Sequence, residues 1–158
     1  MTFSRYFPAY HPRKGEPTYF VEQIWNSLNE LKLPVPKNKD LPHDFMWSIL
    51  PLSNYGAKHH TIRAGNRWKV GDKFSPRVWS GKPYNSKQII IAPDIEIKKV
   101  WNFEIKDSEV NINGFLYNGK TKDLIKNDGL EEMDFWNWFQ FPKPFSGQII
   151  CWNENINY

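Results

Sequence analysis

Three side chains with complementary chemistry lie within six residues of one another, a lysine, a threonine and an arginine. The segment from Gly56 to Arg63 reads Gly-Ala-Lys-His-His-Thr-Ile-Arg, so Lys58 supplies a cation and Thr61 a hydroxyl. An arginine fork binds carboxylates and phosphates in a bidentate manner. The glycine at position 56 lets another backbone or a ligand approach closely. These residue types predict a small polar site.

The spacing of the segment indicates how its side chains are presented. Alternate residues of a β-strand point to the same face, so His59, Thr61 and Arg63 would share one face while Ile62 points to the other. Polar residues on one face and a β-branched residue on the other are typical of a strand that lines a cleft with its back on a core. We therefore expect a strand around Thr61 and a cleft beside it.

The Gly-x-Lys-x-x-Thr-x-Arg pattern resembles the signature of the ASCH family, the PUA-like β-barrel domains linked to RNA and modified nucleosides. Further along, 68–72 (Trp-Lys-Val-Gly-Asp) is similar to the turn that follows the signature in that family. Asp128-Gly129-Leu130 resembles its acidic element, and 145–152 its closing strand. The resemblance covers roughly residues 53–152. It implies an α+β fold built on a PUA-like mixed β-barrel.

The first 52 residues have no counterpart in the minimal ASCH domain, so we divide the chain into 1–52 and an ASCH/PUA-like domain over 53–158. Closely spaced prolines and aromatics over 3–14 predict an extended arm that packs by its rings. A helix is predicted from Pro17 to the prolines at 34 and 36, because its apolar residues recur at helical spacing. This extension is expected to pack on the outside of the barrel.

The remaining elements follow from turn signals and periodicity. Strand patterns or apolar runs occupy 45–52 (helix or strand), 73–79, 88–92, 101–105 and 148–152, and helical patterns occupy 121–127 and 130–139. Asn113-Gly114 between two short apolar runs is a hairpin-turn signal. Strands interrupted by short helices are typical of an α+β barrel.

The resemblance also implies a chemistry. Some small members of the family hydrolyse N(4)-acetylcytidine to cytidine and acetate, and they are similar to this chain at Lys58 and Thr61. They carry a glutamate where this chain has Asp128, which is one methylene shorter. By this resemblance Thr61 would be the nucleophile, Lys58 would assist it, and Asp128 would move protons. Arg63 would orient the carboxylate or hold the substrate.

Asp128 has a structural interpretation as well. With Glu131 it forms an Asp-x-x-Glu pattern in front of an apolar-periodic helix, which is typical of a capping box. A residue that caps a helix can also face a cleft, so both interpretations of Asp128 stand.

A second group of candidate binding residues lies around a glycine turn. Arg77, Trp79, Lys82 and Tyr84 combine two cations and two aromatic rings. One interpretation is a barrel turn with core aromatics. The other is a rim on which a base stacks and a phosphate is gripped.

Composition narrows the classes of function without choosing one. The 158 residues carry a formal net charge of +4 and 16% aromatic residues, which favours anionic partners and offers rings for base stacking. Cys151 is the only cysteine, which rules out an intrachain disulfide and a cysteine-based zinc site. The four histidines show no metal-ligand spacing, so neither a metal nor another cofactor is predicted.

We see no signal peptide or membrane-spanning run, and we expect a cytoplasmic protein without a membrane partner. Three functions remain open. The first is a binding module for RNA or a modified nucleoside, with Gly56, Lys58, Thr61, Arg63 and Asp128 in its cleft. The second is an amidohydrolase acting on acylated nucleosides. The third is a protein-interaction domain whose cleft is a relic.

Overall fold

The computed structural model describes residues 1–36, 54–107 and 109–158, and the fold over these ranges is α+β. Its helices are α1 (Phe20–Glu30), α2 (Thr121–Asn127) and α3 (Glu132–Trp138). Its strands are β1 (His60–Ala64), β2 (Lys73–Phe74), β3 (Arg77–Trp79), β4 (Gln88–Ile90), β5 (Ile95–Glu96), β6 (Lys99–Lys106), β7 (Glu109–Ile112), β8 (Phe115–Leu116) and β9 (Phe145–Cys151). The apolar run 45–52 and the boundary at residue 52 lie outside the described residues.

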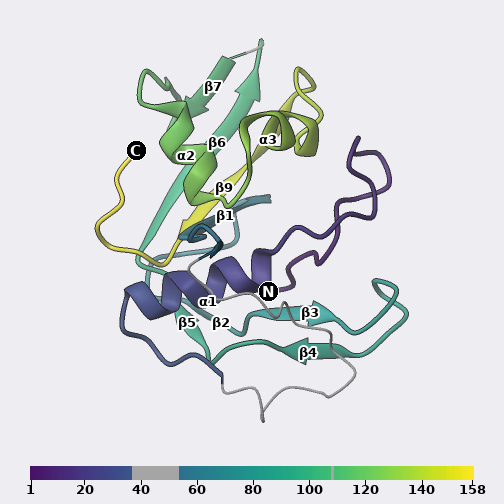
Figure 1. Cartoon of the computed structure of the whole chain (residues 1–158). Helices are drawn as coiled ribbons and strands as arrows, with labels where there is room; N and C mark the ends of the chain where they lie inside the picture. The colour runs from purple at the N-terminus through teal and green to yellow at the C-terminus, as the bar shows by residue number, and fades with distance from the viewer. Residues whose placement is uncertain (37–53, 108) are drawn as a thin grey trace.

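A five-stranded antiparallel sheet forms the centre of the molecule (Figure 1). Its strand order is β1-β9-β6-β7-β8, so the last strand of the chain lies between β1 and β6. Two smaller sheets pair β2 with β5 and β3 with β4. Among the described residues β1 and β8 are the edges of the large sheet, and a closed PUA-like barrel stays a prediction.

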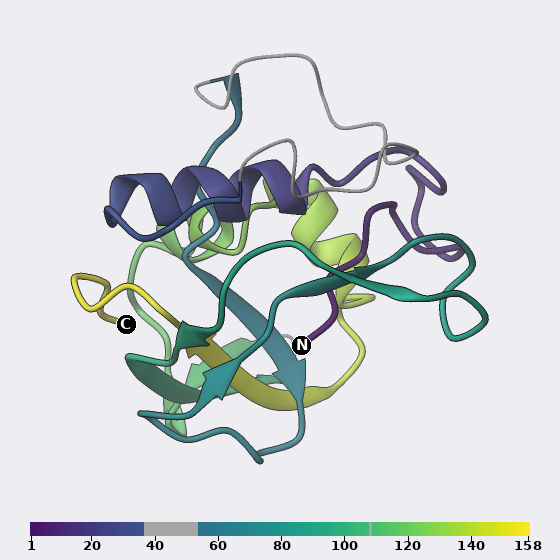
Figure 2. The same ribbon diagram turned by 90° about the horizontal axis from the view of Figure 1, so that it is seen from below.

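Helices α2 and α3 cover one face of the large sheet (Figure 1), and aromatic packing holds α3 there. The ring of Phe103 in β6 contacts Phe135 in α3 and Phe139 at its C-terminal end, with ring centroids 6.4 and 5.8 Å apart. Phe103 and Phe135 are fully buried. Helix α1 lies between these two helices and the β3–β4 hairpin in Figure 1, and Figure 2 shows the hairpin extending away from the sheet.

The N-terminal arm packs by its rings, as the sequence predicts. Phe3 and Phe7 are buried, and Phe3 contacts Trp152, which follows β9. Helix α1 buries the expected apolar residues, but it begins at Phe20 rather than at Pro17. Pro17 instead bridges to Tyr6 in the arm, and the residue before Phe20 has a left-handed backbone, so the helix starts later.

Local backbone chemistry explains the outcome of two predictions, the strand over 73–79 and the hairpin turn at Asn113-Gly114. The expected strand over 73–79 is two strands, β2 and β3, separated by Ser75 and Pro76, because proline has no N–H to donate to a ladder. The Asn113-Gly114 hairpin is confirmed. Both residues have positive φ, 53° and 83°, and they join β7 to β8 as a two-residue turn does.

Candidate functional site

Lys58 and Asp128, seventy positions apart, form an ion pair in the interior. Lys58 is 1% exposed and Asp128 is 4% exposed. The Nζ of Lys58 lies 2.9 Å from Oδ1 of Asp128 and also donates to the main-chain carbonyl of Asp128. The ring of Phe20, the first residue of α1, lies 4.3 Å from the same Nζ. The pair therefore joins residues 56–63, which we call the signature segment, to the end of α2. Phe20 of α1 packs over the ammonium group of the pair.

The position of Asp128 in the fold corrects the capping-box prediction. Helix α3 begins at Glu132 with Glu131 as its N-cap, and no side chain caps it. Asp128 instead ends α2, with φ −79° and ψ −6°. Its carboxylate accepts a hydrogen bond from Lys58. The carboxylate is thus used by the buried ion pair, which outcompetes a local cap.

Burial and pairing shift the pKa values of Lys58 and Asp128 in opposite directions. Burial lowers the pKa of the Lys58 ammonium, and the Asp128 carboxylate beside it works against that. Burial likewise raises the pKa of the Asp128 carboxyl, opposed by Lys58. Each charge is therefore maintained in the interior chiefly by the other.

Thr61 and Arg63 lie on β1 but do not share hydrogen bonds with this pair in the described part of the chain. Thr61 is buried, and it faces Ile150 of β9 across the ladder, whereas Ile62 alternates to the opposite face. The guanidinium of Arg63 is directed to the arm, where it donates to the Thr2 carbonyl at 2.7 Å and lies over the Phe3 ring. The structure therefore brings together Lys58 and Asp128, with Thr61 and Arg63 on the neighbouring strand.

The second predicted group lies elsewhere. Arg77 and Trp79 are in β3, and Lys82 and Tyr84 lie in the turn that follows. The rings of Trp79 and Tyr84 are 5.4 Å apart, and Tyr84 is 87% exposed. Arg63 lies close to this group, because it donates to the Thr2 carbonyl and Thr2 bridges to Arg77. Helix α1 lies between the hairpin and α2 in Figure 1, so the group is separate from the Lys58–Asp128 pair.

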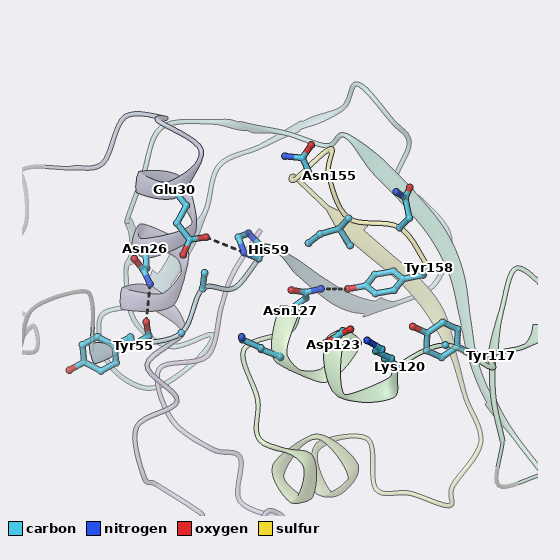
Figure 3. A pocket seen from close by; sticks show the side chains of 16 residues that line it. Asn26, Glu30, Tyr55, His59, Tyr117, Lys120, Asp123, Asn127, Asn155 and Tyr158 are labelled. Carbon is cyan, nitrogen blue, oxygen red and sulfur yellow. Dashed lines mark hydrogen bonds and ion pairs between the residues drawn. The ribbon is translucent and has the colours of Figure 1, made fainter.

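A cavity of about 950 Å³ lies next to the signature segment (Figure 3). We call it the His59 cavity. Its walls are the C-terminal half of α1, segment 55–59, α2 and the C-terminal segment 155–158. Its lining is rich in amides, phenols and charged groups: Asn26, Glu30, Tyr55, His59, Tyr117, Lys120, Asp123, Lys126, Asn127, Asn155, Asn157 and Tyr158. Gly56 also lines it, whereas Lys58, Thr61, Arg63 and Asp128 do not.

The hydrogen bonds of His59 fix its tautomer. Asn155 donates its backbone N–H to Oδ1 of Asn153, which turns Nδ2 of Asn153 toward Nδ1 of His59 at 3.3 Å. The hydroxyl of Ser27 lies 2.9 Å from the same Nδ1 and accepts a hydrogen bond from the indole of Trp152. Because an amide nitrogen can only donate, Nδ1 is the acceptor and Nε2 carries the proton. The Nε2–H lies 3.3 Å from Oε2 of Glu30 (Figure 3).

Ser27, His59 and Glu30 have the connectivity of a nucleophile–base–acid triad, but the serine is closed off. Ser27 is 0% exposed, so no substrate reaches its hydroxyl. A nucleophile has to touch the atom it attacks. The network therefore orients the imidazole and does not activate the serine.

The neighbouring histidine is buried on the other side of the segment. His60 is 0% exposed, and its Nδ1 lies 2.8 Å from the hydroxyl of Tyr158, which accepts a hydrogen bond from Asn127. Its Nε2 lies 3.7 Å from Oδ1 of Asp128 and has no hydrogen-bond partner among the described residues. Burial, with Lys58 nearby, holds the pKa of His60 well below its usual value.

These histidines predict acid sensitivity. Burial lowers the pKa of both His59 and His60, so below pH 6.5 the unfolded chain binds protons that the folded chain excludes. The free energy of unfolding should then fall as the pH falls, by roughly 1 kcal/mol per pH unit for each histidine that stays neutral. Urea titrations between pH 7 and 5 measure this slope. A His60→Gln variant should show a shallower slope, and an unchanged slope would contradict the assignment.

Sequence reasoning missed the His59 cavity because its partners come from distant parts of the chain. The two adjacent histidines indicate that their rings point in different directions, but nothing marks Ser27, Glu30 or Asn153 as partners. One usable signal is the spacing of Ser27 and Glu30, which puts both on one face of α1.

Three further features can be checked for the described residues: metal sites, the cysteine thiol and membrane-spanning helices. They contain no group of three or more histidine, cysteine, aspartate or glutamate side chains that could hold a metal ion. Cys151 is buried, and burial raises its pKa to about 11, so its thiol stays protonated and unreactive near neutral pH. No described helix has the length and apolar character needed to cross a membrane.

Comparison with known proteins adds no relative, since no protein-family model, curated protein or solved structure matches the chain.

Proposed function

We propose that the chain is an ASCH-like, PUA-like domain that binds a nucleoside unit, either free or within single-stranded RNA, in the His59 cavity. The observation that carries this proposal is that different walls of the cavity supply different kinds of group, a histidine donor on one and lysine ammonium groups on another. The signature segment contributes Gly56 and the oriented imidazole of His59. Helix α2 contributes the exposed side chain of Lys126, and its N-cap residue is the exposed Lys120. A nucleotide offers hydrogen-bonding edges, a flat ring and a phosphate, and each has a matching group here.

The size and chemistry of the cavity support a ligand of this class. Cavities of roughly 300–1,000 Å³ hold small-molecule ligands, and this one has about 950 Å³. The ring of Tyr55 points away from the cavity and packs on Tyr19, with ring centroids 5.1 Å apart. Tyr117 lies at the α2 side of the cavity in Figure 3, so an aromatic face is available there. Base stacking on such rings is worth about 1–3 kcal/mol per base.

In this proposal the signature residues support the cavity rather than contact the ligand. The backbone N–H of Lys58 donates to the Gln23 carbonyl in α1, and that of His59 donates to the Asn127 carbonyl at the end of α2. The Lys58–Asp128 ion pair adds a side-chain link between the signature segment and the end of α2. The signature segment is therefore the piece that keeps the two helical walls at a fixed separation.

We favour binding over deacylation. The raised pKa of Asp128 and the lowered pKa of Lys58 suit an acid and a base, but both side chains are buried and neither lines the His59 cavity. A catalytic group has to come within hydrogen-bond reach of the reacting atoms. Incubation with N(4)-acetylcytidine should therefore release no acetate.

Salt dependence tests the proposal with single-stranded RNA. If Lys120 and Lys126 each neutralise one phosphate, the slope of log K against log salt concentration should be about −1.4, since each contributes about −0.7. Lys126→Ala should reduce the slope to about −0.7. Lys106→Ala, an exposed lysine at the end of β6, is the matched control and should leave it unchanged.

The same titration separates the two sources of the ligand. Binding of free nucleotides with a weak response to salt, and none of RNA, would assign the cavity to small ligands. Failure of both RNA and free nucleotides to bind would overturn the proposal.

A further inference from the structure

The Nε2–H donor of His59 lies next to a hydrogen-bond acceptor, the carboxylate of Glu30. Nε2 of His59 and Oε2 of Glu30 are 3.3 Å apart, but no hydrogen bond with good geometry joins them among the described residues. The imidazole is 13% exposed at its side chain and the carboxylate 50%, so a ligand in the cavity reaches both. Glu30 has a second oxygen beside the first. The cavity thus presents one N–H donor followed by two carboxylate acceptors.

We infer that this edge reads guanine, so that the nucleoside unit of the proposed function, on which this inference rests, is a guanosine. Guanine is the common base that shows one carbonyl acceptor, O6, directly followed by two donors, N1–H and the N2 amino group. O6 would accept from Nε2–H of His59, and the two donors would be bound by the two oxygens of Glu30. A carboxylate accepts two parallel hydrogen bonds of this kind.

The other bases leave part of the edge unmatched. Adenine and cytosine offer one amino group beside a ring-nitrogen acceptor, and uracil offers a single N–H between two carbonyls. In each case one carboxylate oxygen of Glu30 is left without a donor or faces a ligand oxygen. An unpaired or repelled charged acceptor lowers affinity, and this is how a polar site rejects a wrong ligand.

The tautomer of His59 is what makes the edge selective. An imidazole free to exchange its tautomers could donate to a carbonyl or accept from an amino group. Here Ser27 and Asn153 keep Nδ1 as the acceptor, so Nε2 can only donate. A ligand that presents an amino group at this position is therefore refused.

Isothermal titration of the full chain with the four ribonucleoside 5′-monophosphates, at one pH and salt concentration, tests the inference. Guanosine monophosphate should bind at least about tenfold more tightly than the other three, since a good bidentate pair discriminates by that much or more. Inosine monophosphate keeps O6 and N1–H but lacks the N2 amino group. It should bind about tenfold more weakly than guanosine monophosphate.

The decisive variant is Glu30→Gln, which keeps the shape of the side chain and replaces one acceptor oxygen by an amino group. It should abolish the preference for guanosine while leaving the fold intact, because Glu30 is exposed in the last turn of α1. Glu22→Gln, in the first turn of the same helix and outside the cavity lining, is the matched control.

The outcomes separate this inference from the proposed function. If none of the nucleotides binds, the proposed function fails and the inference fails with it. If all four bind alike, the cavity is a nucleotide site but the guanine edge is wrong. If guanosine is preferred and the preference survives Glu30→Gln, Glu30 is not the reader and the inference is overturned.

Discussion

Replacing Lys58 with alanine should lower the free energy of unfolding by about 3–5 kcal/mol, because the Asp128 carboxylate is then buried without its cation. The variant also loses the contact of the ammonium with the Phe20 ring. Urea denaturation followed by tryptophan fluorescence measures the change. Lys126→Ala, in the exposed part of α2, is the control and should change stability by less than about 0.5 kcal/mol.

A double variant separates the burial of charge from the loss of packing. Lys58→Met combined with Asp128→Leu removes both charges and keeps most of the apolar volume. Buried ion pairs replaced by apolar residues of similar size are often neutral or stabilising, so the double variant should recover most of the loss. A loss that is additive in the two single variants would contradict a direct pairing of the two groups.

Replacing Gly129 with alanine should cost about 2–4 kcal/mol. Gly129 has φ +77°, a left-handed conformation that L residues adopt at a cost. A Cβ at this position would also lie 3.3 Å from Cβ of Lys58 and displace the end of the Gln23 side chain, which can turn away, so the backbone conformation accounts for most of the cost. Both effects act on the same junction between α1, the signature segment and α2, and thermal or urea unfolding measures their sum.

Gly56→Ala provides the comparison for that variant. A Cβ at Gly56 meets nothing within 4 Å, so its folding free energy should stay within about 0.5 kcal/mol of the parent chain. Gly56 nevertheless lines the His59 cavity. Gly129→Ala as stable as Gly56→Ala would contradict the left-handed backbone at Gly129 as a constraint on this position.

The sequence predicts elements well where a local signal determines them. The Asn113-Gly114 turn needs positive φ at both positions, and α2 occupies 121–127 as its pattern indicates. The apolar spacing of α1 identifies its buried face, although not its first residue. In these cases the deciding interactions lie within a few residues of one another.

The site was only partly predictable for the opposite reason. The family resemblance predicts that Lys58 and Asp128 share a cleft, and the capping pattern at Asp128 predicts a different use of its carboxylate. Only tertiary packing decides which partner the carboxylate takes. Burial of the pair under Phe20 depends on the N-terminal extension, which no local pattern relates to residue 58. The His59 cavity depends on four distant parts of the chain, so its geometry is a property of the assembled fold.

The hydrogen bonds that hold His59 have a thermodynamic consequence for any ligand of the cavity. Ser27 and Asn153 lie 2.9 and 3.3 Å from Nδ1 of the imidazole, and Trp152 in turn donates to Ser27. Folding therefore immobilises the ring. The loss of side-chain entropy that usually opposes association, about 0.5–1.5 kcal/mol for an immobilised side chain, has then already occurred during folding. Such preorganisation lets a small number of polar contacts produce measurable affinity.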